Sequence, residues 1–248
     1  MGKIIPKTAA QIQKLRESGK VHREILQSLQ KFSVAGKTTR EVDERARKLC
    51  RKNRVEPSFF GFGGFPGAVC VSVNNEIVHV PPSEKVLKSG DIFSIDLGVC
   101  RDGWHTDGCV TFGIGKISPA AEKLISATEQ SLRDGIGILR AGVRLGDLGA
   151  QIQNTVEAAG FSVVENLTGH GIGKEVHEPP RVFNFGKKGS GEKLPAGTVL
   201  AIEPIVCEKS AENFTAADGF AILTVDGSLS AHFEHTVVVT EKGAEVLT

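Results

Sequence analysis

Residues 90–99 read GDIFSIDLGV and residues 197–206 read GTVLAIEPIV, two apolar segments that begin with glycine and carry one acid at the same place. This alignment sets Asp96 in register with Glu203. Both segments have the composition of a buried strand, in which aspartate and glutamate are disfavoured. An acid that recurs at one place in two such segments indicates an internal repeat, and it suggests that the acids have a function.

Three further pairs of short strings recur in the same order along the chain. They are Ala35-Gly36 with Ala141-Gly142, His79-Val80-Pro81-Pro82 with His177-Glu178-Pro179-Pro180, and His105-Thr106-Asp107 with His232-Phe233-Glu234. Each half also begins with two segments of helical periodicity, and Thr8, Thr38 and Ser118 are predicted to cap three of these helices. We therefore predict an α+β fold in a single catalytic domain over residues 1–248. Its two pseudo-symmetric halves, about 1–115 and 116–248, would have antiparallel sheets backed by helices.

The composition excludes several classes of protein. The 248 residues carry 30 Lys and Arg against 29 Asp and Glu, a balance that does not favour a dedicated nucleic-acid binder. No apolar run reaches the ~18 residues of a membrane span, and the N-terminus lacks the apolar core of a signal peptide. The five cysteines are odd in number and form no CxxC pair, which indicates reduced thiols. We therefore expect a cytoplasmic protein without a direct nucleic-acid motif.

Four acids lie within or just before segments of strong strand character. They are Asp96, Asp107, Glu203 and Glu234. A hairpin that turns at residues 100–103 would set Asp96 directly opposite Asp107, and carboxylates ~5 Å apart repel each other unless they are protonated or bind cations. Four carboxylates carry a formal charge that two divalent ions would neutralise. Any one of them could equally be an edge residue that faces solvent, but four in symmetric positions favour a metal site.

The histidines give weaker signals. His170 is flanked by glycines in GHGIG (169–173), which lets a metal or a backbone segment approach closely. His79 and His177 are related by the repeat, although each alone is more typical of a turn. We expect His105 and His232 to point away from the neighbouring acids because side chains alternate along a strand. The chain contains no P-loop, no GxSxG and no HExxH, which excludes the sites that those motifs mark.

Taken together, GHGIGKEVHEPP (169–180), the Asp96/Asp107 spacing, IEP (202–204) and SAHFEHTVVVT (230–240) resemble the bacterial type I methionine aminopeptidases over nearly the whole chain. The resemblance implies the pita-bread fold and a dinuclear metal site whose ligands are Asp96, Asp107, His170, Glu203 and Glu234. Asp107 and Glu234 would bridge the ions. Asp96 would complete one coordination sphere, and His170 with Glu203 the other. This mainly hard ligand set favours two divalent ions of Co, Mn, Fe or Zn.

The resemblance also implies an activity, the removal of the initiator methionine from nascent proteins with a small second residue. Two ions ~3.5–4 Å apart would activate a shared water for attack on the peptide carbonyl. His79 and His177 would bind the substrate and act in catalysis, and Glu203 would shuttle the proton. The partners would be N-terminal methionyl peptides and nascent chains, any ribosome contact would use the surface of the domain itself, and the protein would be a monomer without a membrane segment.

The chain departs from the family at several positions. Those that correspond to its methionine pocket are Phe59, Phe62, Phe65, Cys70, Val176 and Phe220, where the family commonly has Cys at the first, Tyr at the next two and Trp at the last. Val80 and Thr106 each replace a glycine. The pocket remains apolar and suits a thioether, so these departures bear on side-chain preference and turnover.

Two other functions are compatible with these motifs. One is an Xaa-Pro aminopeptidase or dipeptidase on the same fold, a class that usually carries an additional N-terminal domain for which 248 residues leave no room. The other is a non-catalytic binding protein of this fold, which would be expected to have lost metal ligands.

Overall fold

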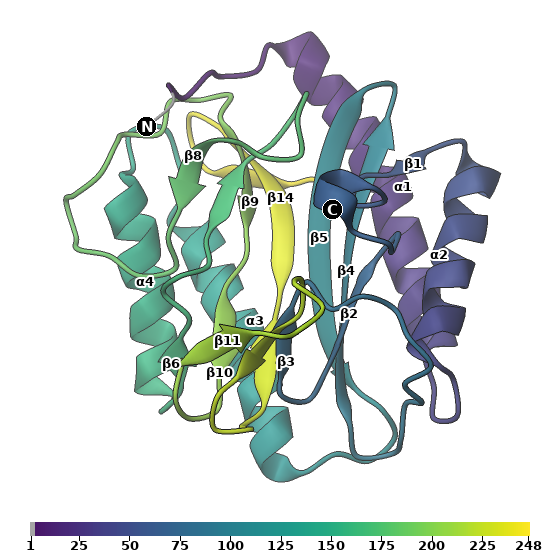
Figure 1. Cartoon of the computed structure of the whole chain (residues 1–248). Helices are drawn as coiled ribbons and strands as arrows, with labels where there is room; N and C mark the ends of the chain where they lie inside the picture. Colours follow the sequence, from purple (N-terminus) through teal and green to yellow (C-terminus); the bar gives the residue numbers. More distant parts are fainter. Residues whose placement is uncertain (1–2) are drawn as a thin grey trace.

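Four long helices lie outside an antiparallel sheet of nine strands in the computed structural model, which describes residues 3–248 (Figure 1). The helices are α1 (Ala9–Phe32), α2 (Thr39–Asn53), α3 (Pro119–Gly137) and α4 (Leu145–Ala158). Thr8 and Thr38 form the predicted capping boxes, and the Ser118 side chain accepts the Ala121 N–H. These helix starts were predictable because a cap depends only on residues within one turn.

The large sheet joins the two halves of the chain. Its strands run in the order β1-β4-β5-β14-β9-β7-β8, with β2 also on β4 and β15 also on β14. Their bounds are β1 (Glu56–Pro57), β2 (Cys70–Val73), β4 (Ile92–Arg101), β5 (Trp104–Gly113), β7 (Gly169–Gly171), β8 (Glu178–Val182), β9 (Val199–Ile202), β14 (Glu234–Val239) and β15 (Ala244–Val246). Because β5 and β14 pair, the strands of both halves form one continuous surface, and its central pair is visible in Figure 1.

Two small sheets complete the fold. One contains β13 (Ser230–His232), β10 (Ile205–Cys207) and β6 (Ser162–Val163), and the other contains β11 (Asn213–Thr215), β12 (Ile222–Thr224) and β3 (Glu76–Val78). A short 3-10 turn, η1 (Phe62–Gly64), precedes β2. The chain passes from the large sheet to a small one between β9 and β10, and it returns between β13 and β14. Glu203 lies in the first crossing, and Glu234 is the first residue of β14, directly after the second.

The predicted register of the β4–β5 hairpin is wrong. Asp96 pairs with Cys109 and Gly98 pairs with Asp107, so the two acids are diagonal neighbours rather than direct partners. The cause is the turn, which is centred on Asp102 and Gly103 instead of one residue earlier. Both of these residues have positive φ, 52° and 72°, as a two-residue type I′ hairpin requires.

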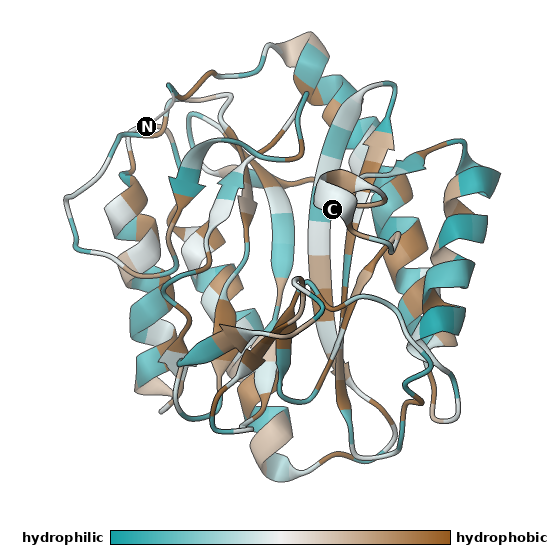
Figure 2. Cartoon of the chain, viewed as in Figure 1, coloured by the Kyte–Doolittle hydropathy of each residue, from teal (hydrophilic) through white to brown (hydrophobic). Residues whose placement is uncertain are grey.

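Each half has its own apolar core between helices and sheet. Leu29, Val42 and Phe93 belong to the first, while Leu148 and Val237 belong to the second, and all five are inaccessible to solvent. Figure 2 shows the hydrophilic surfaces of the helices turned outward. No helix within residues 3–248 is long and apolar enough to cross a membrane.

The same backbone hydrogen bond occurs at corresponding places in the two halves. The Gly36 N–H donates to the Leu87 carbonyl at 2.9 Å, and the Gly142 N–H donates to the Leu194 carbonyl at 2.8 Å. Gly36 and Gly142 have nearly equal φ angles, 92° and 90°. The same local structure thus precedes α2 in one half and α4 in the other.

Candidate metal centre

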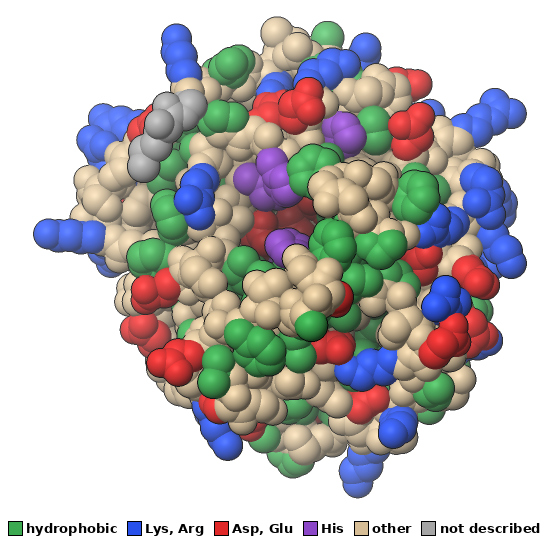
Figure 3. Space-filling model, viewed as in Figure 1, with side chains coloured by type: hydrophobic (Ala, Val, Ile, Leu, Met, Phe, Trp, Pro, Cys, Tyr) green, Lys and Arg blue, Asp and Glu red, His purple; other side chains and the backbone are tan. Residues whose placement is uncertain are grey.

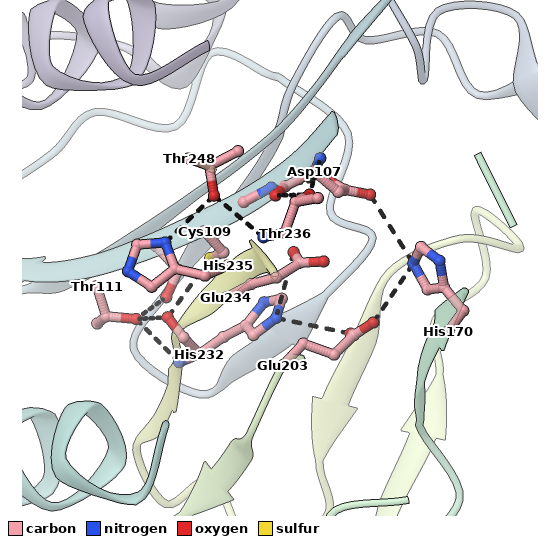
Figure 4. A network of polar contacts seen from close by, with 12 residues as sticks. Asp107, Cys109, Thr111, His170, Glu203, His232, Glu234, His235, Thr236 and Thr248 are labelled. Carbon is pink, nitrogen blue, oxygen red and sulfur yellow. Dashed lines mark hydrogen bonds and ion pairs between the residues drawn. The ribbon is translucent and has the colours of Figure 1, made fainter. Parts of the chain in front are cut away.

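The acids singled out in the sequence converge on the face of the large sheet that is turned away from the helices. Gly108 faces α1, since a Cβ built there would lie 3.0 Å from Nε2 of His22. Side chains alternate along a strand, so the Asp107 side chain points to the opposite face. Asp96 lies on that same face as the diagonal neighbour of Asp107. Figure 4 shows Asp107 turned toward His170, Glu203 and Glu234.

Glu203 and Glu234 stand opposite each other. Ile202 pairs with His235 in the large sheet and Ile205 pairs with His232 in the small one, so a single register runs through both crossings. That register sets Glu203 across from Glu234. The close opposition that the sequence predicted for Asp96 and Asp107 therefore occurs in the second half of the site.

His170 completes the cluster from β7. Its Nδ1 lies 2.9 Å from the Gly171 carbonyl, which can only accept, so Nδ1 carries the hydrogen and Nε2 is left as a free electron pair. Nε2 lies 3.9 Å from Oδ2 of Asp107 and 3.6 Å from Oε1 of Glu203. One ligand atom each from Asp107, His170 and Glu234 lies within 4.8 Å of the other two. An imidazole oriented in this way is the usual arrangement of a metal-binding histidine.

The glycines around His170 allow backbone segments to approach. A Cβ on Gly169 would lie 2.4 Å from the Ala201 carbonyl oxygen, and one on Gly171 would lie 2.1 Å from that of Pro179. Both distances are far below van der Waals contact. The GHG sequence is thus required for β7 to fit between β8 and β9 with His170 aimed at the acids.

The electrostatics of the cluster favour the binding of protons or cations. Burial raises the pKa of Asp96 to about 7. Burial, together with the neighbouring carboxylates, also raises the pKa values of Asp107, Glu203 and Glu234 well above their usual range. Within residues 3–248, Oδ1 of Asp96 and Oε1 of Glu234 are buried without a hydrogen-bond partner. Oxygen atoms of this kind fit divalent cations, which would supply both the missing partners and the missing positive charge.

A cavity of about 270 Å³ opens above the acids. In Figure 3 it appears as a hollow with acidic atoms at its floor and histidines at its edge. Its apolar wall comes from the pocket residues singled out in the sequence, except that Val176 is buried without lining it. The wall consists of Phe59, Phe62, Phe65, Cys70 and Phe220, and Gly63 and Gly219 complete it. The cavity therefore joins an acidic floor to an apolar wall.

His79 and His177 both line this cavity. The His177 ring meets the His170 ring edge-on, with centroids 4.4 Å apart, and also contacts the edge of Phe62 at 5.2 Å. His79 lies just beyond β3 with a positive φ of 58°. Burial lowers the pKa of both imidazoles, and His177 lowers that of His79 further. Both rings are therefore neutral at pH 7 and can donate one hydrogen bond each.

Comparison with known proteins identifies the family. The model of the metallopeptidase family M24 matches residues 13–241. The chain belongs to metallopeptidase family M24. A methionine aminopeptidase of Clostridium perfringens is 48% identical to this M24 chain over 245 residues, which cover 99% of this chain and 98% of the relative.

Solved structures agree with this assignment. The methionine aminopeptidase of Thermotoga maritima superposes on this M24 chain with a TM-score of 0.97 at 42% identity, covering 99% of both chains. The prolidase of Pyrococcus furiosus superposes with a TM-score of 0.81 at 21% identity, and the alignment covers 98% of this chain and 65% of the prolidase. The second likeness shows the shared fold alone. The expected pita-bread fold is thereby confirmed.

His232 is a site residue that the sequence reasoning misplaced in this M24 chain. Its Nε2 lies 3.6 Å from Oε2 of Glu203 and 4.0 Å from Oε2 of Glu234, so the ring points toward the acids and not away from them (Figure 4). Residues two apart on a strand share a face, and this spacing separates His232 from Glu234. The signal was therefore present in the sequence. For His105 the ring contacts Ser58 Oγ at 2.9 Å and does not line the cavity.

A loop beside β8 carries His177 at the rim of the M24 site. Oε1 of Glu178 accepts the backbone N–H groups of Lys174 and Glu175, at 2.6 and 3.2 Å. Its Oε2 accepts a hydrogen bond from Nζ of Lys7. The Lys174 ammonium lies over the buried Trp104 ring, 4.5 Å from its centroid. The residue next to His177 thus fastens this loop to the segment that precedes α1.

Proposed function

We propose that this M24 protein is a methionine aminopeptidase that releases N-terminal methionine from peptides and nascent chains whose second residue is small. The observation that carries the proposal is the single cavity that joins a buried acidic cluster to an apolar wall of phenylalanines. The named relatives support the same activity, since they match this chain over almost its full length.

The residues of the cluster divide into three roles in this proposal. Asp107 and Glu234 would take part in binding both divalent ions, the role that the resemblance to the family implies for them. Asp96 would help to hold one ion, and His170 with Glu203 the other, consistent with the 3.6 Å between Nε2 of His170 and Oε1 of Glu203. The oxygen-rich ligand set with one imidazole suits Mn, Fe, Co or Zn.

Two divalent ions bound here would lower the pKa of a water molecule and polarise the scissile carbonyl. Glu203 would accept the proton of that water and return it to the nitrogen of the breaking peptide bond. His79 and His177, which both line the cavity, would donate hydrogen bonds to the peptide oxygen of the substrate, which gains negative charge as the water attacks. The phenylalanine wall binds the methionine side chain and excludes water from it.

A panel of three peptides that begin with Met-Gly, Met-Leu and Ala-Pro, assayed with Mn²⁺, tests this function. We expect rapid release of methionine from the first, slow release from the second and none from the third. Cleavage of the Ala-Pro peptide alone would replace the proposal with an Xaa-Pro aminopeptidase. Chelation should abolish the activity and Mn²⁺ or Co²⁺ should restore it, whereas full activity after exhaustive metal removal would refute the metal mechanism.

We further propose that the protein acts in the cytoplasm as a monomer and that it contacts the surface of the ribosome. Five free cysteines, four of them buried, support a reducing compartment. Sedimentation of the purified protein, alone and with ribosomes, tests the oligomeric state and the contact. A dimer would contradict the monomer, and a complete absence of ribosome binding would contradict the contact.

A further inference from the structure

His232 is not among the expected metal ligands, yet its Nε2 lies within 4.0 Å of both acids in the second half of the cluster. It is 2% exposed, and within residues 3–248 its Nε2 has no hydrogen-bond partner. A buried ring nitrogen without a partner costs free energy because it has lost its hydrogen bonds to water. Such an atom is retained in a site when the bound form of the site supplies its partner.

The backbone of His232 is held firmly in place. Oγ1 of Thr111 accepts the His232 N–H at 2.9 Å and donates to the His232 carbonyl at 2.6 Å, so one hydroxyl replaces the two bonds of a strand partner. Thr111 is itself 2.7 Å from Oγ of Ser94 on the neighbouring strand β4. Figure 4 shows Thr111 beside the His232 backbone while the ring extends toward Glu203. The ring direction is therefore built into the sheet.

Glu203 lies between two imidazoles. Its Oε1 is 3.6 Å from Nε2 of His170, and its Oε2 is 3.6 Å from Nε2 of His232. Glu234 is farther from His232, at 4.0 Å. When Glu203 binds a cation through Oε1 it is ionised, and Oε2 then needs a donor. Closing the gap to His232 to the ~2.8 Å of a charge-assisted hydrogen bond requires a shift of less than about 1 Å.

We propose that His232 is a positioning residue that donates its Nε2–H to Oε2 of Glu203, and so fixes the orientation in which Oε1 faces His170 and the metal centre. This inference rests on the proposed metal-dependent function. It adds that one of the two ions depends for its affinity on an imidazole that does not touch it.

Titration of the metal-free protein with Mn²⁺ in a calorimeter tests the inference through ion binding alone. Glutamine places its amide N–H close to the position of Nε2, whereas the shorter asparagine reaches only the position of Nδ1. For His232→Asn we expect one of two binding steps to weaken by about 10–100-fold, and for His232→Gln we expect affinity within about threefold of wild type. His232→Ser, whose hydroxyl is too short, replaces the asparagine variant if that variant does not fold.

His105→Asn is the matched control, because the repeat aligns His105 with His232 while its ring contacts Ser58 away from the acids. It should leave both binding steps unchanged. Wild-type affinity in His232→Asn would overturn the inference. Equal losses in the glutamine and asparagine variants would also overturn it, because the imidazole would then be a ligand and not a donor. If the wild-type protein itself binds no Mn²⁺, the proposed function fails instead.

Discussion

Lys7 reaches across 171 residues of sequence to Glu178, the neighbour of His177, and both side chains are largely buried, at 10% and 18% exposure. Burial opposes ionisation of Glu178, but the hydrogen bonds from Lys7 and the loop outweigh it and lower the pKa of this carboxyl. Lys7→Met would leave that charge without its partner. We expect a loss of stability on the order of 1–3 kcal/mol and a lower kcat, with metal content unchanged.

Urea unfolding, kcat and metal analysis of Lys7→Met check this prediction. Arg16→Met is its control, since the pair between Arg16 and Glu245 is exposed and distant from the cavity. In that variant the free energy of unfolding should fall by less than about 1 kcal/mol, and kcat should not change. A Lys7→Met protein that is less stable but turns over normally would show that the loop keeps His177 in place without the lysine.

Metal stoichiometry separates the bridging acids from the others. Asp107→Asn should lose both ions, because it removes a charge that both ions share, whereas Asp96→Asn should retain one. Elemental analysis after gel filtration measures the ions per chain. Two ions retained in Asp107→Asn would contradict the proposed bridging role.

The metal-free protein should become less stable as the pH rises from 7 to 8. A carboxyl whose pKa is higher in the folded than in the unfolded state keeps its proton in the fold and releases it on unfolding, so alkali favours unfolding. Asp96 has a pKa of about 7, and burial together with the neighbouring carboxylates raises the pKa values of Asp107, Glu203 and Glu234 well above their usual range. Each proton that the folded state retains and the unfolded state lacks lowers the free energy of unfolding by about 1.4 kcal/mol per pH unit. In this window most histidines are neutral in both states.

Chemical unfolding at several pH values, with and without Mn²⁺, measures this slope. Saturating Mn²⁺ should remove it, since ions replace the protons. Asp96→Asn should reduce it, and Glu245→Gln should not, because Glu245 is exposed and its pKa is lowered by Arg16. Stability of the metal-free protein that is constant or increasing over this range would disprove the electrostatic account of the cluster.

Gly171→Ala should displace His170. The added Cβ would lie 2.1 Å from the Pro179 carbonyl oxygen, which is backbone and cannot rotate away. We expect the free energy of unfolding to fall by about 1–3 kcal/mol and ion binding to weaken. Gly137→Ala is the control, since Gly137 ends α3 with open space around it, and this change should be neutral or stabilising by up to about 1 kcal/mol. Normal ion binding by Gly171→Ala would mean that β7 tolerates the extra atom.

Local signals in the sequence predict a large part of this structure. The caps at Thr8 and Thr38 depend on side chains within one helical turn, and an acid inside an apolar run, such as Asp96, is visible without any tertiary information. The four acids could be singled out in this way, whereas His170 was assigned to the site through the resemblance to a family. Their roles as ligands remain a proposal.

The errors arise where geometry over longer distances decides. The hairpin register depends on two positive φ angles at Asp102 and Gly103, and the Asp-Gly pair was the signal that should have fixed the turn. The direction of His232 follows from its spacing to Glu234, but its contact with Glu203 depends on two strand crossings that no local pattern marks. The pairing of Lys7 with Glu178 leaves no trace in either segment alone.

Trp104, buried under the Lys174 ammonium, has a practical consequence. The chain contains one tryptophan and no tyrosine, so its near-ultraviolet emission comes almost entirely from a single indole beside the loop that bears His177. Any substrate or inhibitor that shifts this loop will change the polarity around that indole. The protein thus carries an intrinsic optical probe beside this loop, and a ligand that moves the loop can be followed without a label.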